Sequence, residues 1–262
     1  IHGRQPAIGV VTAYITHPGL QRHVAGQVIA GIHRDHTRAV QITKPDAIHA
    51  FKMTLLTVAI AVPLNTIFGI ACAHLLVRSN IRGKWLIGAV VDMPFAVSPV
   101  VIGLALILVY GTGGWFGADL AAVGIQVIFS TPGIVMAVIF VSLPFVAREV
   151  IPVLQEIGDD AEKAAETLGA SAWQTFRKIT LPAIRWGVSY GIVLTTARAL
   201  GEFGAVTVVS GNITGETQTR PLDVSQQFEL FNSVGAYSAS LILAILALGT
   251  LLAMNLMRRG ED

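Results

Sequence analysis

Two charged residues inside an apolar stretch, Arg198 and Glu202, have the types and spacing that could act on an ion. They stand four residues apart, so on a helix they share one face and can form a pair. Such residues in a membrane segment mark either an ion path or a structural ion pair. Two interpretations are therefore open: Arg198 attracts or gates an anion, or the pair fixes helix packing. We favour packing or gating over direct contact with a substrate, and Gly201 and Gly204 beside the pair permit close helix approach.

Asp92 and Ser98 raise the same question in an earlier apolar stretch. Asp92 lies near Arg82 and Lys84, and we expect it to pair with a basic group or a helix end rather than to contact a passing ion. Ser98 precedes Pro99, whose nitrogen cannot donate the hydrogen bond that a continuous helix needs. We expect a bent or broken helix there, which could line a cavity.

The segment from Glu162 to Pro182, EKAAETLGASAWQTFRKITLP, is polar and lies between two apolar runs. Its pattern predicts two short helices around Gly169, which suits a left-handed C-cap. Pro182 would end the unit before the next apolar run. Ala164 and Ala165 are small, so another protein can approach this face closely. The segment is typical of a docking element rather than of a catalytic one.

Capping residues predict where these two short helices begin. Asp159 can cap the first helix, with Glu162 at its third position. Ser171 can cap the second helix, with Gln174 at its third position. We therefore expect a capping box at the start of each helix.

Metal binding is the weaker interpretation of the histidines. Five of the seven lie near the N-terminus: His2, His17, His23, His33 and His36. His33 and His36 could share a helical face, but without a cysteine partner or a second matched pair the ligand set is incomplete. We expect no metal site. The single cysteine, Cys72, cannot form an internal disulfide and leaves the redox compartment undetermined.

The composition predicts an integral membrane protein. Hydrophobic residues make up 53% of the 262-residue chain and charged residues 13%, and the mean hydropathy is +0.66. A soluble domain has roughly a quarter of its residues charged. The length leaves room for five or six helices of about 20 residues with their loops, and for no separate soluble domain. A net charge of +2, spread along the chain, gives no support for nucleic-acid binding.

Five apolar stretches are candidates to cross about 30 Å of hydrocarbon as helices. They cover about residues 50–77, 85–110, 129–147, 186–209 and 236–257. Prolines interrupt the first three, which a membrane helix tolerates where neighbours satisfy the freed carbonyl. We predict an all-α membrane bundle with five recognisable spans.

Basic residues alternate between the loops, and short loops rich in lysine and arginine stay in the cytoplasm. On one side lie Arg78, Arg82 and Lys84, then Arg148, Lys163, Arg177, Lys178 and Arg185, then Arg258 and Arg259. On the other side, the loops 111–130 and 211–235 hold only Arg220. We therefore expect the insert, residues 159–182, and the tail, residues 258–262, in the cytoplasm.

The segment before the first predicted span does not fit this alternation. With five spans and an inner C-terminus, residues 1–49 would lie outside, yet their first part, residues 1–45, holds Arg4, Arg22, Arg34, Arg38 and Lys44. A sixth span would resolve the conflict, but the apolar run at 7–15 is too short to cross the hydrocarbon. We expect an atypical N-terminal segment from which the first span is missing.

Three segments carry a resemblance to a known family. The insert resembles the EAA loop of ABC importer permeases, through Ala164, Ala165, Gly169, Leu181 and Pro182. Two further runs are DMPFAVSPVVIGLALILVYG, residues 92–111, and ARALGEFGAVTVVSGNITGETQTRPL, residues 197–222. Together they are similar to the sulfate/thiosulfate importer permeases of the CysW type, with molybdate permeases as near relatives. The resemblance covers about residues 46–257.

The resemblance implies a type I (MetI-like) permease fold, usually of six spans, and a transport subunit of the cell membrane rather than an enzyme. It implies import of sulfate or thiosulfate by alternating access, beside a second, CysT-like permease, an ATPase homodimer and an extracytoplasmic sulfate-binding protein. The chain has no G-x-x-x-x-G-K-[ST] phosphate loop, so ATP and Mg would be bound by the ATPase and no cofactor by this chain. The coupling residues would be Glu162, Lys163, Ala164, Ala165, Gly169, Leu181 and Pro182. A path or gate would include Asp92, Ser98, Arg198, Gly201, Glu202 and Gly204.

Lys163 departs from the family pattern, which has glutamate six residues before the loop glycine, and Glu162 could substitute one residue earlier. Three alternatives stay open. A molybdate or tungstate permease would share the ALGEFGA core, although the loop 211–222 favours sulfate. A membrane-embedded enzyme would need clustered acids, histidines or a nucleophile beyond the three charged residues above. An ion-driven transporter would need no docking loop and would usually show inverted repeats.

Overall fold

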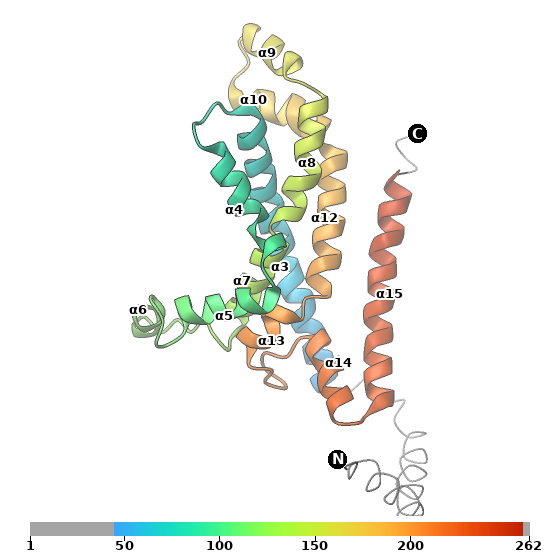
Figure 1. Ribbon diagram of the computed structural model, residues 1–262. Helices are drawn as coiled ribbons and strands as arrows, with labels where there is room; N and C mark the ends of the chain where they lie inside the picture. Colours follow the sequence, from blue (N-terminus) through green and yellow to red (C-terminus); the bar gives the residue numbers. More distant parts are fainter. Residues whose placement is uncertain (1–44, 259–262) are drawn as a thin grey trace, which may run out of the picture.

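Three long apolar helices and two bent helix pairs dominate the computed structural model, which describes residues 45–258 (Figure 1). The long helices are α3 (Pro45–Arg78), the nearly continuous α7 (Thr131–Ser142) with α8 (Pro144–Glu156), and α15 (Ser233–Arg258). The bent pairs are α4 (Lys84–Ala96) with α5 (Pro99–Tyr110), and α12 (Arg185–Leu200) with α13 (Gly204–Ser210). By length and composition this part holds three membrane spans, or up to five if each bent pair counts as one.

The all-α prediction is confirmed for residues 45–258, where no strand occurs. The predicted spans 50–77, 129–147 and 236–257 each coincide with one of the long helices. The middle one continues to Glu156, because Leu143 keeps helical backbone angles and Pro144 occupies the first turn of α8, where its missing N–H breaks no bond. The predictions for the N-terminal segment, its five histidines and the missing first span lie outside the described residues.

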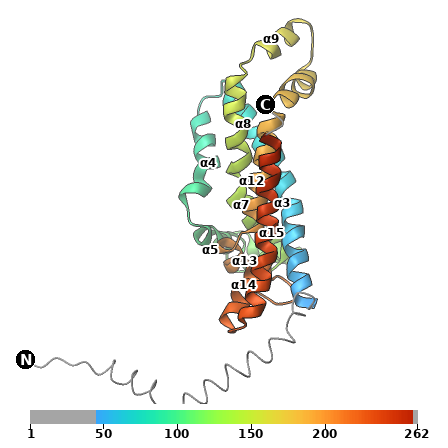
Figure 2. The same cartoon turned by 90° about the vertical axis from the view of Figure 1, so that its right-hand side faces the viewer.

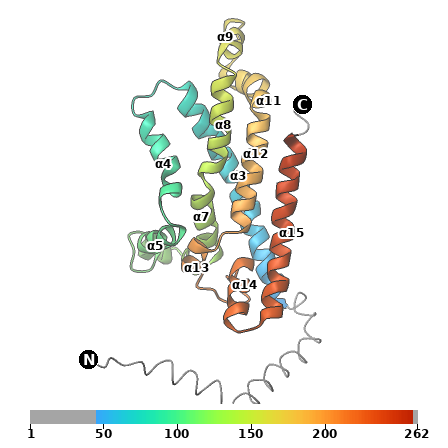
Figure 3. The ribbon, with the colours of Figure 1, turned by 45° about the vertical axis from the view of Figure 1, so that its right-hand side comes forward.

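Helix α3 packs against α7, α8 and α12 (Figure 3). Two glycines allow the closest approaches. A Cβ atom on Gly69 of α3 would lie 2.6 Å from Val146 Cβ, and one on Gly191 of α12 would lie 2.7 Å from Val146 Cα. Small residues are what allow membrane helices to pack at such short distances. Gly69 and Gly191 therefore bring α3 and α12 onto α8 at the same residue.

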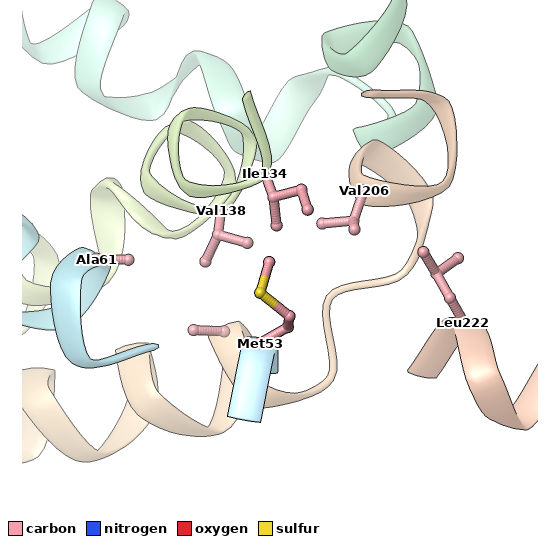
Figure 4. Packing of buried hydrophobic residues seen from close by; sticks show 7 residues of the cluster. Met53, Ala61, Ile134, Val138, Val206 and Leu222 are labelled. Atoms are coloured by element: carbon pink, nitrogen blue, oxygen red, sulfur yellow. The ribbon is translucent and has the colours of Figure 1, made fainter. Parts of the chain in front are cut away.

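A buried cluster joins this bundle to the second bend. Met53 of α3 points between Ile134 and Val138 of α7 and Val206 of α13, close to Leu222 (Figure 4). All five side chains are at most 6% exposed. Burial of this kind stabilises a bundle through close packing of side chains. The cluster thus holds α13 against the long helices.

The two bends lie against each other. The angle between α4 and α5 is 113°, and that between α12 and α13 is 53°. The predicted bend at Ser98 is confirmed, but the angle is so large that residues 85–110 do not form one straight helix, and α5 runs across the bundle (Figure 1). Ser98 is extended, with φ −60° and ψ 137°, since the residue before a proline avoids the helical region. A Cβ atom on Gly103 of α5 would lie 2.8 Å from the Ala205 carbonyl oxygen of α13.

Short helices lie beyond the long ones. The predicted insert consists of α9 (Asp160–Thr167), α10 (Ala172–Thr175), the π-helix η2 (Phe176–Thr180) and α11 (Leu181–Ala183). It projects past the ends of the long helices (Figure 2). Helix α14 (Arg220–Glu229) lies at the opposite end, and α6 (Gly117–Ala122) follows α5 at the side of the molecule (Figure 1).

Candidate coupling and gate sites

The turn and the second cap of the insert are as predicted. Gly169 has φ +86°, a left-handed conformation that glycine adopts without steric cost, and it separates α9 from α10. Ser171 and Gln174 form the expected capping box. The Gln174 backbone N–H donates to Ser171 Oγ at 3.3 Å, and the Ser171 backbone N–H donates to Gln174 Oε1 at 2.9 Å. The second helix of the insert therefore begins where its local sequence dictates.

The first predicted cap is wrong. Asp159 precedes α9, but its backbone, with φ −118° and ψ 5°, lies outside the extended region that a capping side chain needs. Its carboxylate instead pairs with Lys163 Nζ at 2.8 Å. This hydrogen bond lowers the pKa of Asp159, and Asp159 raises the pKa of Lys163. An ion pair along the helix has replaced the capping box.

The prediction that Pro182 ends the insert is also wrong in detail. Helical backbone runs through Pro182 to Ala183, and the irregular residue before α12 is Ile184. The preceding π-helix makes this possible. The Leu181 N–H donates to the Phe176 carbonyl, five residues back, so Pro182 falls in the first turn of α11, where no amide donor is required.

Glu162 and Lys163 point in different directions. Glu162 is only 12% exposed, with Oε2 2.7 Å from Arg78 Nε at the end of α3, and Oε1 accepts a hydrogen bond from Thr180 Oγ1 at 2.7 Å. Lys163 is 66% exposed and contacts its own helix. The acid one residue early is therefore the one that connects the insert to the rest of the molecule. Sequence reasoning missed both partners, because Arg78 counted only as a loop charge and Thr180 carries no local signal.

The insert also exposes apolar side chains. Leu168 is 87% exposed and Trp173 is 67% exposed, and the small residues Ala164 and Gly169 lie open beside them. Trp173 stacks on Phe176, with ring centroids 5.8 Å apart. Large side chains this exposed at a projecting tip are typical of a protein contact surface.

The Arg198–Glu202 pair forms as the spacing predicted. Arg198 Nη1 lies 2.5 Å from Glu202 Oε2, and the Glu202 side chain is 1% exposed whereas that of Arg198 is 30% exposed. Glu202 Oε1 also accepts the Ala205 backbone N–H at 2.8 Å, so the carboxylate satisfies a free donor at the start of α13. The pair therefore stabilises the bend between α12 and α13.

Among the predicted gate residues, the two bends bring Ser98 close to Gly204. A Cβ atom on Gly204 would lie 3.0 Å from Pro99 Cβ, the residue next to Ser98. Gly201 lies in the bend itself, at the C-terminal end of α12. Ser98 and Gly204 therefore lie where the two bent pairs touch, and Gly201 lies within one of the bends.

Asp92 has the basic partner that was expected, but on another helix. It pairs with Arg148 of α8, with Oδ2 2.7 Å from Arg148 Nη2, and not with the neighbouring Arg82 or Lys84. The two side chains are 40% and 55% exposed. Arg148 also lies over the Phe95 ring, 6.0 Å from its centroid. Asp92 thus joins α4 to α8.

A second buried ion pair was not predicted. Arg220 Nη1 lies 2.6 Å from Asp223 Oδ2, and the side chains are 2% and 7% exposed. The Arg220 backbone N–H donates to Thr54 Oγ1 at 2.8 Å, and its guanidinium lies 3.5 Å from the Ala47 carbonyl oxygen. These contacts tie α14 to the start of α3. The partners are 166 residues apart, and sequence reasoning had noted Arg220 only as an isolated loop charge.

Metal ligands do not gather in this part of the chain. Within residues 45–258 no group of three histidine, cysteine, aspartate or glutamate side chains could hold an ion.

Comparisons with known proteins agree with this geometry. Residues 65–259 match the family described as the inner membrane component of binding-protein-dependent transport systems. The sulfate transport system permease protein CysW of Synechococcus elongatus is 54% identical over 208 residues, which cover 79% of this chain and 73% of that protein. CysW of Escherichia coli strain K12 is 46% identical over 217 residues, covering 83% and 75%.

Among solved structures, a bacterial ABC transporter involved in the import of the acidic polysaccharide alginate aligns with a TM-score of 0.70 at 18% identity, over 86% of this chain and 83% of that one. The fold is thus that of a type I ABC importer permease. Family and fold make the chain a multi-pass transport component rather than an enzyme. The chain belongs to the inner membrane components of binding-protein-dependent transport systems, within the group of the CysW permeases.

Proposed function

We propose that this chain is a permease subunit of an ATP-driven importer and carries sulfate, or thiosulfate, across the cytoplasmic membrane by alternating access. The observation that carries the proposal is the identity of about half of the aligned residues with sulfate permeases, over some four-fifths of the chain. At this level of identity, we expect the chain to carry the same substrate as those permeases. The remaining proposals concern how ATP hydrolysis and the anion act on this chain.

The insert, residues 159–182, docks on an ATPase homodimer in the cytoplasm. Its exposed Leu168 and Trp173, with Ala164, Ala165 and Gly169 nearby, supply a projecting apolar face of the kind that fits a groove. ATP and Mg bind the ATPase. Nucleotide-driven closure of the ATPase moves the insert, and the insert moves the helices attached to it.

The contact between the two bends acts as the gate. Ser98, Gly201 and Gly204 lie at or beside breaks in helices, where small changes in backbone angles rotate α5 and α13. Arg198 keeps 30% of its side chain exposed although Glu202 neutralises it, so the guanidinium can approach an anion that reaches the bend. The Asp92–Arg148 pair holds α4 on α8 while α5 moves.

The importer needs further chains. A second, CysT-like permease completes the pathway, and an extracytoplasmic binding protein delivers sulfate, in keeping with the binding-protein dependence of the family. Membrane lipid covers the remaining apolar faces. The anion is selected mainly by the binding protein, which is why one partly exposed arginine suffices at the gate.

Uptake of labelled anions tests the substrate. Cells that lack their own sulfate and molybdate permeases would express this chain with its partner subunits. We expect uptake of labelled sulfate that unlabelled thiosulfate competes for and molybdate does not. Uptake of molybdate without sulfate would replace the proposal with the molybdate alternative.

Co-purification tests docking. Ala165→Asp places a charge on the small-residue face of α9, and we expect it to reduce recovery of the ATPase with the permease. The ATPase should co-purify with the unaltered chain. Equal recovery with both chains would rule out docking through the insert.

A further inference from the structure

Arg78 is the last residue of α3, and each nitrogen of its guanidinium contacts a different segment. Nε pairs with Glu162 of α9 at 2.7 Å. Nη1 donates to the Leu154 carbonyl at 3.0 Å, and Nη2 donates to the Gly158 carbonyl at 2.5 Å. With only 13% of its side chain exposed, Arg78 lies inside this junction rather than in solvent.

The Leu154 carbonyl belongs to the last turn of α8, and the Gly158 carbonyl to the turn that follows this helix. The last carbonyls of a helix have no partner within it, and they carry the negative end of the helix dipole, so a cation there is favourable. Gly158 has φ +64°, and this left-handed residue turns the chain away from α8 toward the insert. Arg78 therefore holds the turn through which the chain passes from α8 to the insert.

Glu162 extends the junction to the second half of the insert. Its other oxygen accepts the hydroxyl of Thr180, which is 1% exposed and ends the π-helix η2. One ion pair thus connects α3, the α8 end, α9 and η2. We call Arg78, Glu162, Thr180 and the two carbonyls the Arg78 junction.

The geometry of these donors matters. A guanidinium is planar, always charged, and can serve three acceptors in fixed directions, whereas an ammonium is a single point charge. Charge-assisted hydrogen bonds are also stronger than neutral ones. The Arg78 junction is therefore stiff enough to make the insert and α3 move as one body.

We propose that Arg78 is a positioning residue for transport: through Glu162 it transmits movement of the insert to α3, so that ATP hydrolysis is converted into movement of the membrane helices. This inference rests on the proposed docking of the insert. Arg78 itself does not form the docking surface, because its side chain is only 13% exposed, whereas Leu168 and Trp173 are 87% and 67% exposed. Its loss should disturb transmission more than association.

The test uses the complete importer, reconstituted in vesicles with the binding protein, and measures sulfate imported per ATP hydrolysed. Arg78→Gln and Glu162→Gln should each lower this ratio by about tenfold, the effect of losing a charge-assisted hydrogen bond. The double variant should be no worse than either single one, because both remove the same link. Arg78→Lys should recover part of the ratio, since the ammonium can still pair with Glu162 but cannot serve both carbonyls.

Arg82→Gln is the matched control. Arg82 is exposed, lies in the loop that follows Arg78, and forms no ion pair within residues 45–258. It should leave the ratio unchanged. ATPase recovery is measured in parallel, so that a fault in docking is distinguished from a fault in transmission.

Three outcomes are decisive. If the Arg78→Gln complex assembles and keeps the ratio of the unaltered importer, Arg78 has no positioning role. If Arg78→Gln and Glu162→Gln lower the ratio additively, the two residues do not act through one link and the inference is wrong. If the unaltered chain does not recover the ATPase or import sulfate, the proposed function fails instead.

Discussion

The two ends of α3 are both held by an arginine, but in different ways. At the insert end, Arg78 and Glu162 are 13% and 12% exposed and bring together four segments. At the opposite end, Arg220 and Asp223 are 2% and 7% exposed and join two helices, α14 and α3. Removing one partner of a buried ion pair leaves an uncompensated charge, so the Arg220 pair should contribute more to stability than the Arg78 pair, whose side chains keep some contact with water. The comparison indicates an attachment that mainly stabilises the fold at one end of α3, and one that links α3 to the projecting insert at the other.

The largest expected effect on stability is at the Arg220 end of α3. Arg220→Ala leaves Asp223 buried without a counter-charge, which should lower the free energy of unfolding by about 3–5 kcal/mol. Thermal unfolding in detergent measures the loss. Arg148→Gln is the control, because its pair with Asp92 is about half exposed and should be worth at most about 1 kcal/mol. Equal losses in the two variants would contradict the expectation that the buried Arg220 pair stabilises the fold more than the exposed Arg148 pair.

A second prediction separates the two ends by function. Leu168 is 87% exposed, so Leu168→Asp should not change the unfolding temperature, yet it should weaken recovery of the ATPase about tenfold by placing a charge in an apolar contact. Trp115→Asp is the matched control, since Trp115 is 81% exposed but lies in the loop after α5. Recovery should stay unchanged with that variant. A loss with Trp115→Asp as large as with Leu168→Asp would show that the insert is not the specific contact.

A third prediction concerns how well the insert is ordered. Ser171→Ala removes the side-chain cap of α10, at a cost of about 1 kcal/mol. Amide hydrogen exchange should quicken in residues 172–176 and not in α14. Equal protection in the insert of both proteins would show that the capping box contributes nothing to its order.

The smallest effect is that of pH on the Asp159–Lys163 pair. Because the pKa of Asp159 is lowered, its stabilisation is present above the usual value of about 3.9 and is lost as the pH falls through the lowered pKa. Because the pKa of Lys163 is raised, its stabilisation is present below about 10.4 and is lost as the pH rises through the raised pKa.

Between these limits the pair should add no pH dependence. The difference in unfolding temperature between the chain and its Asp159→Asn variant should stay constant from about pH 5 to 9. It should shrink in stronger acid. A change of that difference near neutral pH would mean that another group titrates with the pair.

Local pattern predicted what short-range forces decide. The spacing of Arg198 and Glu202, the capping box at Ser171 and the left-handed Gly169 were all readable, because each depends on residues at most four positions apart. Asp159 shows the limit of that reasoning. The Asp159 carboxylate can either cap the helix or pair with a lysine four residues on, and it pairs with Lys163.

Long-range contacts could not be predicted in the same way. Arg78 and Glu162 are 84 residues apart, and the residues near either one do not indicate that the other is its partner. The bend at Ser98 was predicted because Pro99 must disturb the helix, but its 113° angle was not. That angle also depends on how closely α5 fits α13, which Gly103 allows.

The π-helix at Phe176–Thr180 makes the insert sensitive to the number of residues as well as to their kind. It holds one residue more per hydrogen-bonded turn than an α-helix does. Deleting Ile179 would let the turn relax to an ordinary α-helix and would remove the hydrogen bond over five residues that places Pro182 in the first turn of α11. The length of this segment is thus as strict a requirement as any side chain in it.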